Sequence, residues 1–84
     1  MPDKNKLAVL QELCKYAAVD NSMQTSFSLL SNNLKLSKNQ LDTVLIELEN
    51  ERYLTQFVIE NNDSFMVKLH QKAFDILQEI KEIK

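Results

Sequence analysis

Glycine is absent from this 84-residue chain, and several kinds of chemistry are excluded with it. Phosphate-binding loops and dinucleotide-binding turns need glycine, because only a residue without a side chain lets the backbone approach a phosphate closely. The chain has a single cysteine, Cys14, which excludes an internal disulfide and fits a reducing compartment. We therefore expect no cofactor.

Histidine and long apolar runs are also scarce. His70 is the only histidine, and with Cys14 it supplies neither a nucleophile with its base nor enough ligands for a structural zinc ion. We expect no catalytic residues and no metal site; His70 should cap the last helix, and Cys14 should be a small core residue. No run approaches the roughly 18 apolar residues that span a bilayer, and the first six residues are largely polar. The sequence thus predicts a cytoplasmic protein without a membrane partner.

Excess positive charge is missing as well. The formal net charge is −2 and the sequence pI is about 5.3, which argues against a protein that binds nucleic acid through positive charge alone. Locally the balance differs, because residues 25–45 carry Lys35 and Lys38 against Asp42. With 44% apolar and 26% charged residues, the composition is that of one small folded domain. A chain of this size buries only about 60% of its unfolded surface, so dimerisation would add useful stability.

The most informative stretch begins at Ser37, which has the residue type and position of a helix N-cap. Four apolar residues follow at the i, i+3, i+4 and i+7 spacing of one buried helix face: Leu41, Val44, Leu45 and Leu48. The opposite face carries Asn39, Thr43, Ile46 and Asn50. This outward face is the candidate working surface.

Other elements follow from the same patterns. Asp3 should cap a first helix over about 4–19, and a short helix should run from residue 26 or 27 to 33. Strands are expected over 53–60 and 65–69 around a turn of Asn, Asp and Ser, with a last helix over about 70–83. The hairpin should pack four apolar side chains on the helices: Phe57, Ile59, Phe65 and Val67. The predicted fold is mainly α (α+β), in the order helix, helix, helix, strand, strand, helix.

The first and last helices carry more apolar residues than one buried face requires. The excess residues are Val9, Tyr16, Ile76, Ile80 and Ile83. Either another helix of the same chain covers them, or a partner subunit does. We expect a homodimer with these residues at its interface.

The run from residue 36 to 54 resembles MarR-like winged-helix regulators, which share a leucine-serine start, the same apolar spacing and a leucine-glutamate pair before the wing. The matching residues are Leu36, Ser37, Leu41, Val44, Leu45, Leu48, Glu49, Tyr53 and Leu54. This resemblance implies a single winged-helix domain over 1–84, with a helix-turn-helix at about 26–51, a wing at about 53–69 and a C-terminal helix at about 70–83. Lys35, Arg52 and Ala73 stand where the family usually has glycine, so those turns must either use positive φ or avoid it.

The resemblance further implies a transcriptional regulator that reads duplex DNA with the helix starting at Ser37. Asn39 and Gln40 would then pair with adenine edges, Thr43 with a base or phosphate, and Ile46 with a thymine methyl group. Lys35 and Lys38 would neutralise phosphates. The candidate wing contacts are Asn61, Asn62 and Lys68.

Two other interpretations of the outward face stay open. It could be solvated polar surface, or it could bind a protein partner in a winged-helix interaction module. Ile46 favours the second, because an apolar residue amid an otherwise neutral face suits a protein interface.

Overall fold

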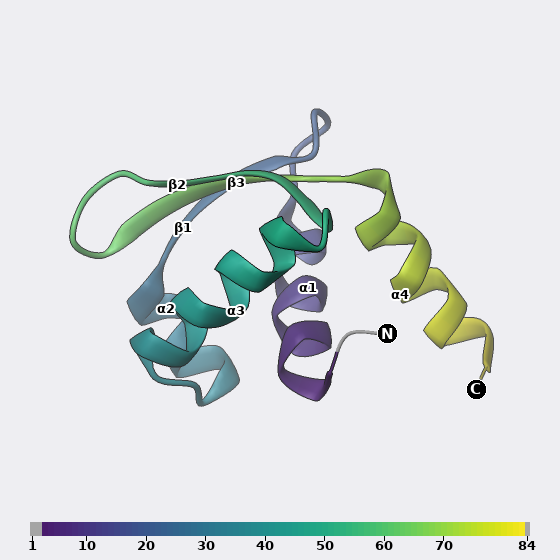
Figure 1. The fold of residues 1–84 in the computed structure, drawn as a ribbon, viewed down its shortest axis with the longest axis horizontal. Helices are drawn as coiled ribbons and strands as arrows, with labels where there is room; N and C mark the ends of the chain where they lie inside the picture. The colour runs from purple at the N-terminus through teal and green to yellow at the C-terminus, as the bar shows by residue number, and fades with distance from the viewer. Residues whose placement is uncertain (1–2, 84) are drawn as a thin grey trace.

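Four helices and a three-stranded antiparallel sheet make up residues 3–83, which are the part of the chain that the computed structural model describes (Figure 1). Side chains are described through residue 79. The elements, in chain order, are α1 (Lys4–Tyr16), β1 (Ser22–Ser26), α2 (Phe27–Leu34), α3 (Lys38–Asn50), β2 (Leu54–Ile59), β3 (Ser64–Leu69) and α4 (Gln71–Ile83).

Strand β1 corrects the predicted order, which lacked it. Its sequence, SMQTS, has one apolar residue and therefore no apolar alternation from which to predict a strand. The strand exists because it pairs with β3, placing Met23 opposite Val67 and Thr25 opposite Phe65. Helix α1 also ends earlier than predicted, at Tyr16, because the chain turns toward β1 and the Ala18 N–H donates to the Ser22 carbonyl at 2.8 Å.

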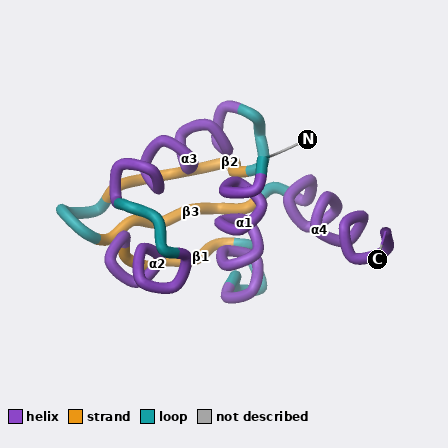
Figure 2. The backbone as a smooth tube through the Cα atoms, turned by 90° about the horizontal axis from the view of Figure 1, so that it is seen from below, coloured by secondary structure: helices purple, strands orange, loops and turns teal. Residues whose placement is uncertain are grey.

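The sheet has the order β1-β3-β2, so β3 is its central strand. Helices α1, α2 and α3 lie together on one side of the sheet (Figures 1 and 2). Alternation along β3 follows from this layering: Phe65, Val67 and Leu69 are buried, whereas Met66 and Lys68 belong to the opposite face. That opposite face is not covered by a helix in either view.

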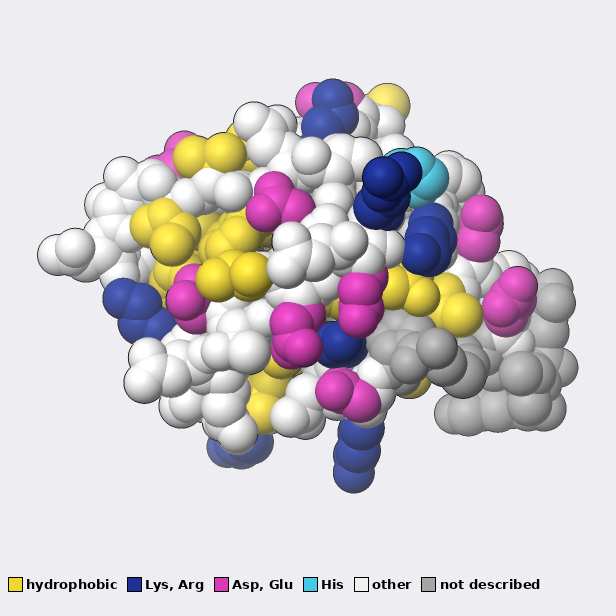
Figure 3. All heavy atoms as spheres, in the orientation of Figure 1, with side chains coloured by type: hydrophobic (Ala, Val, Ile, Leu, Met, Phe, Trp, Pro, Cys, Tyr) yellow, Lys and Arg dark blue, Asp and Glu magenta, His cyan; other side chains and the backbone are white. Residues whose placement is uncertain are grey.

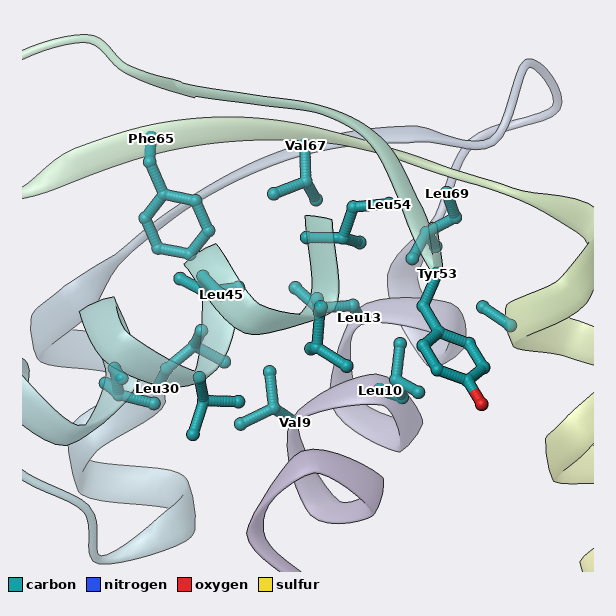
Figure 4. Packing of buried hydrophobic residues seen from close by; sticks show 14 of the residues in the cluster. Val9, Leu10, Leu13, Leu30, Leu45, Tyr53, Leu54, Phe65, Val67 and Leu69 are labelled. Atoms are coloured by element: carbon teal, nitrogen blue, oxygen red, sulfur yellow. The ribbon is translucent and has the colours of Figure 1, made fainter. Parts of the chain in front are cut away.

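Buried hydrophobic residues from all four helices and from both wing strands form one core (Figure 4). Its members are Val9, Leu10, Leu13, Phe27, Leu30, Leu41, Val44, Leu45, Leu48, Tyr53, Leu54, Phe65, Val67, Leu69 and Ala73. Two sequence-based predictions are wrong here. Val9 is fully buried within the monomer, because α1 is packed against both α2 and α3, so it cannot belong to a dimer interface. Ile59 was expected to pack on the helices, yet its side chain is 55% exposed.

Of Lys35, Arg52 and Ala73, the first two have positive φ, as does Asn21 before β1. Lys35 ends α2 at φ 60°, and Arg52 connects α3 to β2 at φ 67°. This conformation costs a residue with a Cβ roughly 1–2 kcal/mol. Ala73 instead lies inside α4, where it is buried and needs no positive φ.

Helix α4 begins at the end of the sheet and leans away from the other helices (Figures 1 and 2). As predicted, His70 caps it, since His70 Nδ1 accepts a hydrogen bond from the Lys72 N–H at 2.9 Å. Ala73 joins the core, while Phe74, Ile76 and Leu77 are half-buried. Within residues 3–83, no helix combines the length and apolar character needed to cross a membrane.

Candidate nucleic-acid interface

The start of α3 is fixed by a reciprocal capping interaction between Ser37 and Gln40. Ser37 Oγ accepts from the Gln40 N–H at 3.2 Å, and Gln40 Oε1 accepts from the Ser37 N–H at 2.9 Å. The predicted N-cap is therefore confirmed. With its carboxamide oxygen engaged, Gln40 keeps only its amide hydrogens for a ligand, and a bidentate pair with adenine would require the cap to open.

Beyond the cap, α3 presents an uncharged polar surface to solvent. Asn39 and Thr43 are exposed, and Ile46 is 45% exposed one turn further along. The core side of the helix is the predicted one, with Leu41, Val44, Leu45 and Leu48 all buried. Since the helix N-terminus concentrates unpaired N–H groups and positive dipole, this first half of α3 is the part suited to an anionic ligand.

The two lysines at this end of α3 have different surroundings. Lys35 is exposed at the left-handed turn before the helix. Lys38 reaches the wing, where its Nζ donates to the Asn62 carbonyl at 2.6 Å and lies 5.3 Å from the centroid of the Phe27 ring. Lys35 is thus available to a phosphate, whereas Lys38 also ties α3 to the wing.

Side-chain hydrogen bonds hold the wing tip in place. Asn61 Oδ1 accepts from the N–H groups of Asp63 and Ser64 at 3.0 and 2.9 Å, which closes the turn between β2 and β3. Asp63 in turn accepts from the backbone and hydroxyl of Ser28 at 3.1 and 2.9 Å, joining the tip to the start of α2. The turn residues were predictable, but the contact between Asp63 and Ser28 was not, because 35 residues separate them.

One of the three predicted wing residues, Lys68, does not lie at the wing tip. Asn61 and Asn62 lie at the tip beside α3, whereas Lys68 lies near the other end of β3. Its partners across the sheet are Ser22 and Gln56, on the face away from the helices. The helix-turn-helix and the wing tip therefore form one continuous surface that does not include Lys68.

Acidic residues gather at the opposite end of α3 and are partly neutralised there. Lys6 Nζ lies 2.9 Å from Glu51 Oε2 and 3.8 Å from Glu47 Oε2. The hydrogen bond that Lys6 donates to the Glu51 carboxylate raises the pKa of Lys6 above its ordinary value, and desolvation opposes this shift. Both carboxylates thus reach Lys6 on α1, and Glu47 also lines an open cleft with Asn39 and Thr43.

Comparison with known proteins gives one structural neighbour to report. No protein-family profile matches the chain, and no curated protein is significantly similar in sequence. A solved structure described as "Structure of the transcriptional regulator homologue protein from Pyrococcus horikoshii OT3" superimposes with a TM-score of 0.64 at 19% identity, covering 93% of this chain and 77% of that one. The fold is a winged helix. At this identity the likeness establishes the fold alone.

Beside α4, the winged helix has a second surface of interest, which corresponds to the predicted dimer interface. Tyr16 is 61% exposed, with Lys15 Nζ 5.4 Å from its ring centroid, and Ile76 is half-buried. Ile80 and Ile83 lie outside the described side chains. An open cleft between α1 and α4 is lined in part by Cys14, Phe74 and Leu77. Of the predicted dimer residues with described side chains, Tyr16 and Ile76 are therefore at least partly exposed, whereas Val9 is buried.

Cys14 is half-buried at this cleft, and its reactivity should report on the packing of α1 against α4. Burial raises the pKa of the thiol to about 11, from an ordinary value of 9.0. At pH 8 the thiolate fraction should therefore be about a hundredfold lower in the folded chain, since each pKa unit changes it about tenfold. Ellman's reagent should react at pH 8 about a hundredfold more slowly with the native protein than with the urea-unfolded chain. Equal rates would contradict the burial of Cys14.

Proposed function

We propose that this winged helix is a transcriptional regulator that binds duplex DNA through the first half of α3. The observation that carries the proposal is the capped start of α3, where Asn39 and Thr43 are exposed and the first turn contains no acidic residue. The structural neighbour, described as a transcriptional regulator homologue, supports the same role. The finer kinship with MarR-like regulators rests on the residue pattern from Leu36 to Leu54.

In this proposal each side chain has a separate role. The carboxamide group of Asn39 forms no hydrogen bond with another residue in 3–83, so Asn39 is the residue suited to a bidentate adenine contact. Thr43 would contact a base or phosphate, and Ile46 a thymine methyl group. Lys35 would bind a phosphate, and Asn62 at the wing tip is exposed for a second backbone contact.

A salt titration tests the proposal directly. Binding to a labelled mixed-sequence duplex should weaken steadily as salt rises, because each neutralised phosphate releases counterions. Lys35→Ala should reduce the slope of log K against log salt by about 1. Lys15→Ala, which removes a lysine from the far end of α1, is the matched control and should leave the slope unchanged. Undetectable duplex binding at low salt would refute DNA binding.

We further propose that the protein is a homodimer that joins through Tyr16 and the side of α4 that carries Ile76. Ile76→Asp should convert the dimer to a monomer, because it places a charge in an apolar interface. Sedimentation equilibrium at high micromolar concentration measures the change, and circular dichroism checks that the fold is retained. Asp75→Asn, one residue away on the exposed side of the same helix, is the control. A wild-type monomer at that concentration would contradict the proposal.

A further inference from the structure

Helix α3 runs alongside strand β2, and two contacts fix how they face each other. At the start of the helix, Lys38 Nζ donates to the Asn62 carbonyl at the wing tip. Near its end, Glu49 Oε2 accepts a hydrogen bond from the Phe57 N–H at 3.1 Å. The helix side that contains positions 38, 42, 46 and 49 therefore faces the wing, since these residues lie within about one quarter of the helix circumference.

Apolar side chains remain uncovered along this line of contact. Ile46 lies between Asp42 and Glu49 on the wing side of α3 and is 45% exposed. Ile59 lies on the same face of β2 as Phe57, two residues away, and is 55% exposed. Ile59 and Asp42 line one open cleft of about 470 Å³ between α3 and the wing. We call this region, made of Asp42, Ile46, Glu49, Phe57 and Ile59, the α3–wing surface.

Hydrophobic side chains gather between the wing and α3 on the face shown in Figure 3, with acidic side chains beside them. Asp42 is half-buried, and its carboxylate accepts no hydrogen bond and forms no ion pair with any residue in 3–83. Glu49 contributes a second carboxylate, bonded through one oxygen to the Phe57 N–H. Lys38 is a cation on the same side of α3, and its ammonium group already donates a hydrogen bond to the Asn62 carbonyl.

These features indicate which kind of ligand would bind the α3–wing surface. Beyond Lys38 at one end, a DNA phosphate placed here would meet two carboxylates and two isoleucines, which is unfavourable both electrostatically and in desolvation. A protein segment with apolar side chains beside lysine or arginine matches both parts of the surface. From Lys38 to Glu49 the helix rises roughly 16 Å, which is about three turns of a partner helix laid alongside it.

We propose that the α3–wing surface binds a basic amphipathic helix of another protein, whose apolar side chains cover Ile46 and Ile59 and whose cations pair with Asp42 and Glu49. Because Lys38 and Asn39 line the same cleft, the bound helix would also obstruct the first half of α3. That competition with DNA rests on the proposed function, whereas binding of the helix does not.

The test uses the full chain and a labelled leucine-lysine peptide of about 18 residues with its leucines on one helical face. Ile59→Asn should weaken peptide binding at least about tenfold, as expected for a central apolar contact. Val58→Asn is the matched control, because Val58 is 41% exposed on the opposite face of the same strand, and it should change affinity less than about twofold. Asp42→Asn should weaken binding about threefold and reduce its dependence on salt.

Three results would overturn the proposal: no peptide binding by the wild type, equal effects of Ile59→Asn and Val58→Asn, or equal affinity for a leucine-glutamate peptide. Equal effects of the two variants would indicate binding without a defined apolar site, and equal affinity for the acidic peptide would show that Asp42 and Glu49 do not select cations. A parallel titration with duplex DNA separates the two proposals. Peptide binding with the expected variant pattern but no duplex binding supports this surface and refutes DNA binding. Loss of duplex binding in Ile59→Asn without peptide binding by the wild type would assign the surface to DNA and refute the helix partner.

Discussion

Asn39→Glu should reduce duplex affinity at least about a hundredfold, equivalent to roughly 2.7 kcal/mol. The substitution removes the side chain proposed to read adenine, a contact worth about 1–3 kcal/mol, and places a carboxylate against the phosphates. The same substitution should not lower the stability of the fold. Glutamate in the first turn of a helix interacts favourably with the helix dipole by about 0.3–1 kcal/mol, so the thermal midpoint should stay the same or rise.

Fluorescence anisotropy with a labelled duplex measures the binding loss, and calorimetry measures the thermal midpoint. Gln11→Glu is the control, because it adds the same charge on α1, next to the α1–α4 cleft. Duplex affinity in Gln11→Glu should fall less than about threefold, as expected of a charge more than a Debye length, about 8–10 Å, from the phosphates. Equal losses in the two variants would mean that net charge, rather than the position of Asn39, controls binding.

Phe65→Ala should cost about 3–5 kcal/mol of the free energy of unfolding, the largest stability effect we expect from one side chain. Phe65 is fully buried on the central strand, with its ring centroid 4.7 Å from that of Phe27 and 5.7 Å from that of Phe57. Removing the ring leaves a cavity between α2 and the sheet and ends both aromatic contacts. A domain of this length has a total stability of about 4–13 kcal/mol, so the variant should be marginally folded.

Urea denaturation followed by circular dichroism measures this loss, and the midpoint should fall by more than about 1 M. Val58→Ala is the control, since it shortens an exposed side chain on the sheet face away from the helices, and it should cost less than about 0.5 kcal/mol. A loss below about 1.5 kcal/mol for Phe65→Ala would show that the three rings do not form the centre of the core.

Helix α3 shows how far local pattern alone can go. Its cap, its start and its four buried residues were all predictable, because capping chemistry and 3.6-residue periodicity depend only on neighbours within one or two turns. The hairpin was predictable for a similar reason, since its alternation and its turn residues are local. The burial of Val9 and the exposure of Ile59 were not, because both depend on which elements pack beside them.

At the candidate interface, too, the sequence predicted the local features and the structure decided the long-range ones. The residue types at the start of α3 could be chosen from the sequence, and the structure places most of them on one surface. Their availability could not be foreseen: Gln40 is engaged in the cap, Lys38 reaches Asn62, and Lys68 lies away from the wing tip. Each of these depends on a hydrogen bond or a register that no local pattern specifies.

By itself the sequence determined the helices, the hairpin and the absence of glycine-dependent chemistry, because these follow from composition and from interactions between near neighbours. Tertiary structure alone decided that the polar segment SMQTS becomes strand β1, since its strand conformation comes from backbone pairing with β3 rather than from its side chains. It also decided that α3 lies beside β2, with Ile46 and Ile59 left exposed. That placement arises only from the packing of the core, which sets α3 against β2.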